Sequence, residues 1–109
     1  MLVYLNVGGV FFATSRDTLR ESDSFFSGLV QNECCHEYFV DRDPTHFRHV
    51  LNWLRGVRSL PDDEAILREL WWEADYYALT DMRDMIASTP ARYNIARSVA
   101  NIAGELRHK

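Results

Sequence analysis

The most reactive side chains in this sequence are two adjacent cysteines followed by a histidine, Cys34-Cys35-His36, and two histidines three residues apart, His46 and His49. Thiolates and imidazoles are the ligands that zinc prefers, so these residues could contribute soft metal ligands. Their spacing fits no standard zinc pattern, and adjacent cysteines rarely direct both sulfurs at one ion. We therefore expect a polar loop with two free thiols, and we expect neither a metal nor any other cofactor.

The sequence also lacks the standard catalytic motifs in which such cysteines and histidines could act. The chain contains no Gly-x-Ser-x-Gly, no His-Glu-x-x-His and no phosphate-binding loop, which are patterns that position nucleophiles, metals and phosphates in enzymes. We therefore expect that the protein is not an enzyme. A zinc-dependent or thiol-dependent enzyme stays open as a remote alternative, and bound zinc or a cysteine of low pKa would reveal it.

Length and composition narrow the class of protein further. A chain of 109 residues with 47% hydrophobic side chains can bury one core. The formal net charge of −4 offers no basic surface to a phosphate backbone, which argues against a nucleic-acid partner. No apolar run approaches the roughly 20 residues of a membrane helix, so we expect no membrane insertion of this segment.

A disulfide between neighbouring cysteines is strained, and two free thiols favour a reducing compartment, by default the cytoplasm.

The first elements to be positioned are two short strands at the N-terminus. Residues 2–7 and 10–14 are rich in β-branched and aromatic side chains, and they flank Gly8-Gly9, which suits the positive φ angles of a two-residue turn. This pattern predicts a β-hairpin. One face of the first strand is apolar, while the other carries Leu2, Tyr4 and Asn6. We expect this mixed face to be available to a partner.

A strand at residues 38–40 and a helix after it form the next predicted unit. Asp43 before Pro44 resembles an N-cap followed by a proline at the first helical position. The sequence therefore predicts a helix from Pro44 to about Arg55. Gly56 follows where a left-handed C-terminal cap is needed. An apolar stripe at helical spacing supports the assignment and consists of Phe47, Val50, Leu51 and Leu54.

Shorter helices complete the predicted elements. We expect one helix at residues 16–20 capped by Ser15, and a second capped by Ser22 or Asp23, with a polar loop at residues 31–37. Acidic residues at 62–64 favour the start of a helix that runs to about residue 75. Thr80 or Asp81 would cap a short helix through residue 86. A final helix is expected at residues 91–107.

Several ordered blocks of this sequence resemble one known family. They are Leu5-Asn6-Val7-Gly8-Gly9, Phe12, Thr14, Thr18-Leu19, Phe39-Val40-Asp41-Arg42-Asp43-Pro44, Phe47, Leu51-Asn52-Trp53-Leu54-Arg55 and Glu73-Ala74-Asp75-Tyr76-Tyr77-Ala78-Leu79. In this order they resemble the tetramerisation (T1) domain of the BTB/POZ superfamily, over roughly residues 2 to 87. Within the superfamily, these motifs are most similar to those of the soluble potassium-channel-tetramerisation-domain (KCTD) proteins.

The resemblance implies a fold and an assembly. The fold is α/β, with a small three-stranded mixed sheet, an N-terminal β-hairpin and about five to six flanking helices. We expect residues 1–87 to form the oligomerisation domain and residues 88–109 a C-terminal helix that packs on it or extends it. Family members form rings of four or five protomers through polar head-to-tail contacts, in which two unlike patches of each subunit meet. We therefore expect a homo-tetramer or a homo-pentamer.

Charged and amide side chains near the predicted helix are the candidates for that interface. An arginine can bind a carboxylate through two parallel hydrogen bonds, which suits a polar contact between subunits. In the alternative, Asp41 and Asp43 cap the helix, and Arg42 pairs with them inside one subunit. The expected interface residues are Asn6, Asp41, Arg42, Asp43, Asn52 and Arg55.

The resemblance also implies partners other than the chain itself. BTB domains often recruit a cullin ubiquitin-ligase scaffold, which makes Phe25, Phe26 and Tyr38 candidate contacts, with core packing as the alternative for each. The function expected is therefore that of a KCTD-like adaptor that presents substrates to a cullin-RING ubiquitin ligase. The alternative is the cytoplasmic tetramerisation domain of a voltage-gated potassium channel. Some channel T1 domains carry an interface zinc, but here the later helices contain no cysteine, so we expect no such site.

Overall fold

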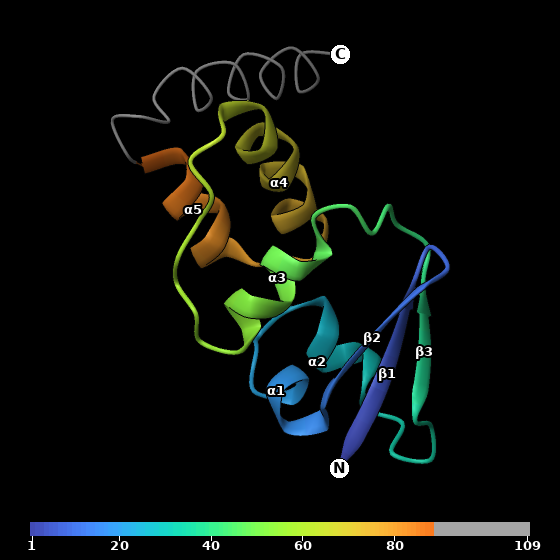
Figure 1. Cartoon of the computed structure of the whole chain (residues 1–109). Helices are drawn as coiled ribbons and strands as arrows, with labels where there is room; N and C mark the ends of the chain where they lie inside the picture. The colour runs from blue at the N-terminus through green and yellow to red at the C-terminus, as the bar shows by residue number, and fades with distance from the viewer. Residues whose placement is uncertain (89–109) are drawn as a thin grey trace, which may run out of the picture.

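The computed structural model describes residues 1–88, which form a three-stranded sheet and five helices (Figure 1). In chain order the elements are β1 (Leu2–Val7), β2 (Val10–Ser15), α1 (Arg16–Arg20), α2 (Phe25–Leu29), β3 (Glu37–Val40), α3 (Phe47–Leu54), α4 (Glu64–Tyr76) and α5 (Thr80–Ser88). The helix expected at 91–107 lies outside the described residues. No helix within residues 1–88 combines the length and the apolar character needed to cross a bilayer.

The sheet has the order β2-β1-β3 and is mixed, as predicted. β1 pairs antiparallel with β2 through the hairpin and parallel with β3, which arrives after α1 and α2. Gly8 and Gly9 form the turn with φ angles of 57° and 101°, which glycine adopts without steric cost. The hairpin prediction is therefore confirmed down to the turn residues.

Only one face of the sheet is covered. In Figure 1 the helices lie to one side of the strands, and Val3, Leu5 and Val7 on that side are fully buried. Strand residues alternate between faces, so their neighbours in sequence lie on the other face. That outer face of the sheet has no helix against it within residues 1–88.

Aromatic side chains join the helices into one core beneath the sheet. The ring of Tyr77 stacks on Phe26, with centroids 4.7 Å apart, and lies 5.7 Å from Phe47. These three residues come from the end of α4, from α2 and from α3, and each is at most 1% exposed. Burial of such large rings contributes a major share of the hydrophobic stabilisation of a small domain.

The helix predicted to begin at Pro44 begins instead at Phe47. Asp43 does not cap it, because the Asp43 carboxylate accepts hydrogen bonds from the backbone N–H (2.8 Å) and the hydroxyl of Thr45, two residues on. The carbonyl of Pro44 then accepts from the N–H of Phe47 at 3.0 Å. Asp43-Pro44 therefore forms a turn that precedes α3. The C-terminal prediction is confirmed, since Gly56 has φ 93° just after Arg55.

Two other helix starts differ from the prediction. Ser24, not Ser22 or Asp23, caps α2, because the Ser22 hydroxyl already donates to the carbonyl of Leu19 at the end of α1. α5 includes Thr80 from its first turn, since the N–H of Arg83 bonds to the carbonyl of Leu79. In both cases the preceding helix end determines which residue is free to start the next helix.

The end of α4 is a tight reversal. Ala78 lies in the left-handed region with φ 57°. Its N–H bonds to the carbonyl of Asp75, and the N–H of Leu79 bonds to the carbonyl of Ala74 at 2.8 Å. This pair of bonds is the Schellman arrangement, which normally has glycine at the left-handed position. It turns the chain directly into α5.

Candidate self-association surface

The hairpin turn packs directly against the segment that follows β3. The N–H of Gly8 bonds to the carbonyl of Val40 at 3.0 Å, and a Cβ at Gly8 would lie 2.4 Å from the carbonyl oxygen of Arg42. Asn6 fixes the turn from within, because its side-chain oxygen accepts from the N–H of Gly9 at 2.8 Å. The structure therefore brings Asn6 and residues 41–43 together at one end of the sheet.

Arg42 is held inside its own protomer by a residue that the sequence did not point to. Its guanidinium binds the carboxylate of Glu73 on α4 through two parallel hydrogen bonds, Nε to Oε1 at 3.2 Å and Nη2 to Oε2. It also lies over the ring of Tyr76, 4.3 Å from the centroid. Hydrogen bonding to Glu73 raises the pKa of Arg42. Pairing of Arg42 with Asp41 or Asp43, the alternative considered from the sequence, does not occur.

The two aspartates beside Arg42 differ in their contacts. Thr45 holds the Asp43 carboxylate through its hydroxyl and its backbone N–H, and these hydrogen bonds lower the pKa of Asp43. Asp41 is exposed, and within residues 1–88 it forms no hydrogen bond or ion pair. Of the three residues after β3, Asp41 is therefore the one whose side chain has no partner within residues 1–88.

Asn52 and Arg55 lie elsewhere, at the C-terminal end of α3. Arg55 Nη2 donates to the carbonyl of Ala13 at 2.7 Å, on β2, which is an edge strand of the sheet. Asn52 is partly buried, and its backbone carbonyl accepts from the N–H of Val57 at 2.9 Å. Neither side chain bonds to residues 41–43 in the described part of the chain. The candidate interface residues therefore lie in two groups, at opposite ends of α3.

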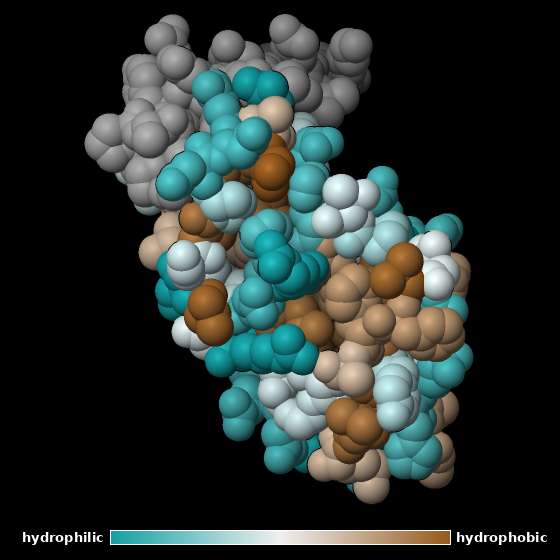
Figure 2. All heavy atoms as spheres, in the orientation of Figure 1, coloured by the Kyte–Doolittle hydropathy of each residue, from teal (hydrophilic) through white to brown (hydrophobic). Residues whose placement is uncertain are grey.

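Large apolar side chains are exposed on the outer face of the sheet, level with Asn6. Phe11 on β2 and Phe39 on β3 are 56% and 61% exposed, and both are paired in register with Asn6 on β1. Leu2 and Tyr4 continue the same face along β1. Figure 2 shows apolar surface gathered over the strands, beside a surface over the helices in which hydrophilic and apolar residues are mixed. Sequence alternation marked this face as available to a partner, but it did not single out Phe11 or Phe39.

Comparison with known proteins identifies the fold. A family model described as BTB/POZ domain matches residues 3–86. The chain belongs to the BTB/POZ family. It is of the potassium-channel tetramerisation type and KCTD-like, and the family is one of self-associating protein-interaction domains.

Three relatives illustrate the similarity. The chain is 44% identical over 96 residues to "FH protein interacting protein FIP2" of Arabidopsis thaliana, covering 78% of this chain and 32% of that protein. It is 41% identical over 83 residues to the human "BTB/POZ domain-containing protein KCTD17", covering 69% of this chain and 26% of that protein. It is 34% identical over 93 residues to bovine "BTB/POZ domain-containing protein KCTD5", covering 77% and 40%. The chain thus spans well under half the length of these relatives.

The three aromatic residues considered as partner contacts are placed differently in this BTB/POZ domain. Phe26 is fully buried in the aromatic core, and Tyr38 is 8% exposed. The hydroxyl of Tyr38 accepts from Arg16 Nη1 at 2.9 Å and bonds to the carbonyl of Asn32 at 2.8 Å. Phe25 is partly exposed and contacts the ring of Tyr76, with centroids 5.6 Å apart. Only Phe25 therefore keeps part of its ring on the surface.

The cysteines and histidines of the BTB/POZ domain do not converge. Cys34 and Cys35 are free, and His46 Nε2 lies 3.0 Å from the carboxylate of Glu69. Burial lowers the pKa of His49, and the charges of Arg48 and His46 lower it further. Across residues 1–88, no group of three or more His, Cys, Asp or Glu side chains is placed to hold a metal ion.

Proposed function

We propose that copies of this chain join head to tail into a closed ring of four or five, and that the ring serves as a cytoplasmic, non-catalytic adaptor that presents substrates to a cullin-RING ubiquitin ligase. The observation that carries the ring proposal is the uncovered outer face of the sheet. This face exposes Leu2, Tyr4, Phe11 and Phe39, and a group of large apolar side chains exposed together is typical of an interaction site. Phe11 and Phe39 on either side of Asn6 would form its centre.

The polar groups at the two ends of α3 supply the asymmetry that a ring needs. Head-to-tail contacts join unlike patches of identical subunits, and the rotation from one to the next determines the number that closes the ring. Asp41 at the end of β3 is an exposed anion, while Arg55 at the end of α3 is an exposed cation. We propose that Asp41 of one copy pairs with Arg55 of the next, with Asn52 beside it and with Arg42 and Asp43 holding the β3 end in shape.

A ring would act by multiplying weak contacts. When several copies of a binding site are tethered together, the second contact forms at a high effective concentration, and the overall affinity rises without a new contact. This suits an adaptor that holds a substrate and a ligase scaffold at once. The two free cysteines support a reducing, cytoplasmic location, and the partly exposed Phe25 is our candidate for the scaffold contact.

The ring is tested by measuring the mass of the purified chain at micromolar concentration by light scattering and native mass spectrometry. We expect four or five copies per particle, and we expect Phe11→Ser together with Phe39→Ser to lower that number without loss of the circular dichroism of the fold. Val57→Ser is the matched control, because Val57 is 49% exposed but lies outside the sheet. A monomer from the unaltered chain would refute the ring, and an equal effect of Val57→Ser would refute the role of the sheet face.

The adaptor proposal is tested separately, by titrating a purified cullin N-terminal domain into the assembled chain in a calorimeter. We expect saturable binding at micromolar concentration. Absence of heat from a chain that is shown to be assembled would refute the cullin contact and leave the ring proposal standing.

A further inference from the structure

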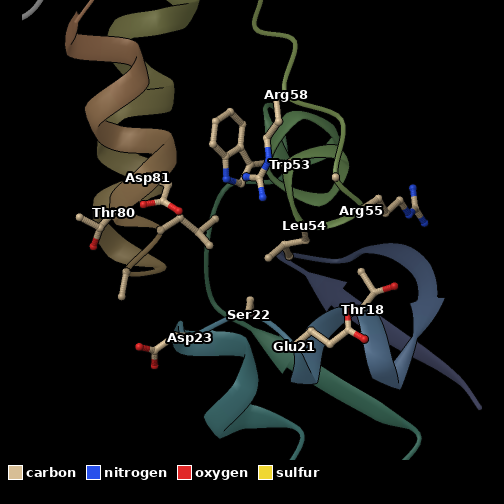
Figure 3. A pocket seen from close by; sticks show the side chains of 13 residues that line it. Thr18, Glu21, Ser22, Asp23, Trp53, Leu54, Arg55, Arg58, Thr80 and Asp81 are labelled. Carbon is tan, nitrogen blue, oxygen red and sulfur yellow. The ribbon is translucent and has the colours of Figure 1, made fainter.

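A pocket of about 600 Å³ opens on the domain away from the outer sheet face, between the turn after α1, the end of α3 and the start of α5. This volume is within the usual range of ligand sites. We call it the Trp53 pocket (Figure 3). The side chains that matter for its chemistry are Glu21, Ser22, Asp23, Trp53, Arg58 and Asp81.

Trp53 presents to this pocket a donor that has no protein partner. The residue is only 5% exposed, and within residues 1–88 its indole N–H forms no hydrogen bond, while the nitrogen itself is not fully enclosed and can be reached from the opening. Figure 3 shows the indole nitrogen on the side of the ring that faces the opening, with Arg58 folded over the ring, 4.2 Å from the centroid. Buried tryptophan usually finds a partner for its N–H. An acceptor supplied by a ligand would provide that partner.

Carboxylates surround the same opening. Glu21, Asp23 and Asp81 line the pocket and are exposed, and none of them forms an ion pair or a side-chain hydrogen bond with the rest of residues 1–88. Figure 3 shows Glu21 and Asp23 across the opening from Trp53, while Asp81 stands on α5. The three carboxylates do not converge as metal ligands would. They are spread along the opening and suit an elongated cationic ligand.

Cations of the protein do not neutralise these carboxylates. Arg55 lines the pocket, but its guanidinium points away from the opening in Figure 3 and donates to the carbonyl of Ala13. Arg58 lies over the indole ring, on the wall opposite Asp23. The side of the opening formed by the turn after α1 is therefore negative, which favours a basic partner.

We propose that the Trp53 pocket binds an extended, basic peptide segment of another protein. A backbone carbonyl of the peptide accepts a hydrogen bond from Trp53 Nε1, and an arginine or lysine beside it pairs with Glu21 and Asp23. Asp81 adds a third negative charge at the α5 end. This site is separate from the outer sheet face, so each chain of an assembly would carry its own copy.

The test uses nuclear magnetic resonance of the full chain labelled with nitrogen-15, because tryptophan indole N–H groups give resolved signals. The probe is the blocked peptide acetyl-Ala-Arg-Ala-Arg-Ala-amide, and the matched control peptide carries glutamate in place of arginine. Trp53→Phe assigns the Trp53 signal. We expect a saturable shift of that signal with the basic peptide, no shift with the acidic peptide, and weaker binding as salt is added.

Two double variants test the electrostatic part. Glu21→Gln with Asp23→Asn should lower the affinity for the basic peptide by about three- to tenfold, as expected for exposed ion pairs. Glu37→Gln with Asp62→Asn removes the same charge from exposed positions outside the pocket and should leave affinity nearly unchanged. An unshifted Trp53 signal at millimolar basic peptide, an equal response to the acidic peptide, or equal weakening by both double variants would overturn the proposal. None of these outcomes depends on the oligomeric state.

Discussion

The pairing of Arg42 with Glu73 gives the sharpest test of how the interface is built, because it assigns Arg42 to the interior of one protomer. We predict that Glu73→Gln destabilises the fold and leaves the mass of the assembly unchanged. The side chains of Arg42 and Glu73 are 28% and 15% exposed. The pair therefore lies between exposed ion pairs, worth about 0.2–1 kcal/mol, and buried ones, whose disruption costs about 3–5 kcal/mol.

The expected magnitudes follow from that position. Loss of two charge-assisted hydrogen bonds, partly offset by hydration, should cost about 1–2 kcal/mol in Glu73→Gln. Arg42→Met should cost about 2–3 kcal/mol, since it also removes the cation–π contact with Tyr76, worth about 0.5–1 kcal/mol. The double variant should cost less than the sum of the two, with a coupling energy of about 1–2 kcal/mol.

Urea unfolding followed by circular dichroism measures these free energies, at one fixed protein concentration because assembly contributes to stability. Light scattering on the same samples reports the mass. The reasoning is refuted if Glu73→Gln leaves the unfolding midpoint unchanged, or if Arg42→Met lowers the mass while the coupling energy is near zero. The first result would mean that the pair adds no net stability, and the second that Arg42 acts between copies.

Three further predictions concern the core and the helix ends. Ala78→Gly should raise the free energy of unfolding by about 1 kcal/mol, because glycine occupies the left-handed region without the cost borne by alanine, whereas Ala65→Gly within α4 should lower it; urea unfolding of both variants decides the sign. Tyr77→Phe should not destabilise the fold and should stabilise it by up to about 1 kcal/mol, because the Tyr77 hydroxyl is buried without a partner; a measurable loss of unfolding free energy in urea would contradict it. The pKa of His49 is lowered by burial, so the folded state disfavours its protonation, and this contribution to stability should be present above pH 6.5 and be lost as the pH falls below it. His49→Gln should flatten that part of the stability curve, and an unchanged slope would exclude His49 as its source.

The parts of the fold that the sequence predicted correctly are those that depend on neighbours in the chain. Alternation in residues 2–7 and the diglycine determined both the hairpin and the face that is buried. The same alternation places Phe11 opposite Asn6, so the exposed sheet face was within reach of sequence reasoning. The sequence did predict that this face is available to a partner, but it did not name Phe11 or Phe39, because polar residues were favoured as interface candidates and exposed phenylalanines were not considered.

The errors arose where two local structures compete or where the partner is distant. Asp43-Pro44 is compatible with a helix N-cap and with a turn, and the Thr45 hydroxyl adds the bond that favours the turn. Glu73 is 31 residues from Arg42 in sequence, and only the packing of α4 beside the end of β3 brings them together. No local pattern could reveal that pair, although Glu73 stands in one of the blocks shared with the family.

One buried arginine has a consequence for altering this domain. Arg16, 4% exposed, begins α1 and donates hydrogen bonds to the carbonyls of Val30 and Cys35 and to the hydroxyl of Tyr38. The carbonyl of Cys35 in the loop at residues 31–37 accepts from both Arg16 and the hydroxyl of Tyr38. A residue added to this loop would displace that carbonyl and deprive the buried guanidinium of Arg16 of an acceptor. Epitopes, dyes or fused proteins are therefore better inserted in the exposed connection at residues 57–59. An insertion there would leave the pairing of β3 with β1 unchanged.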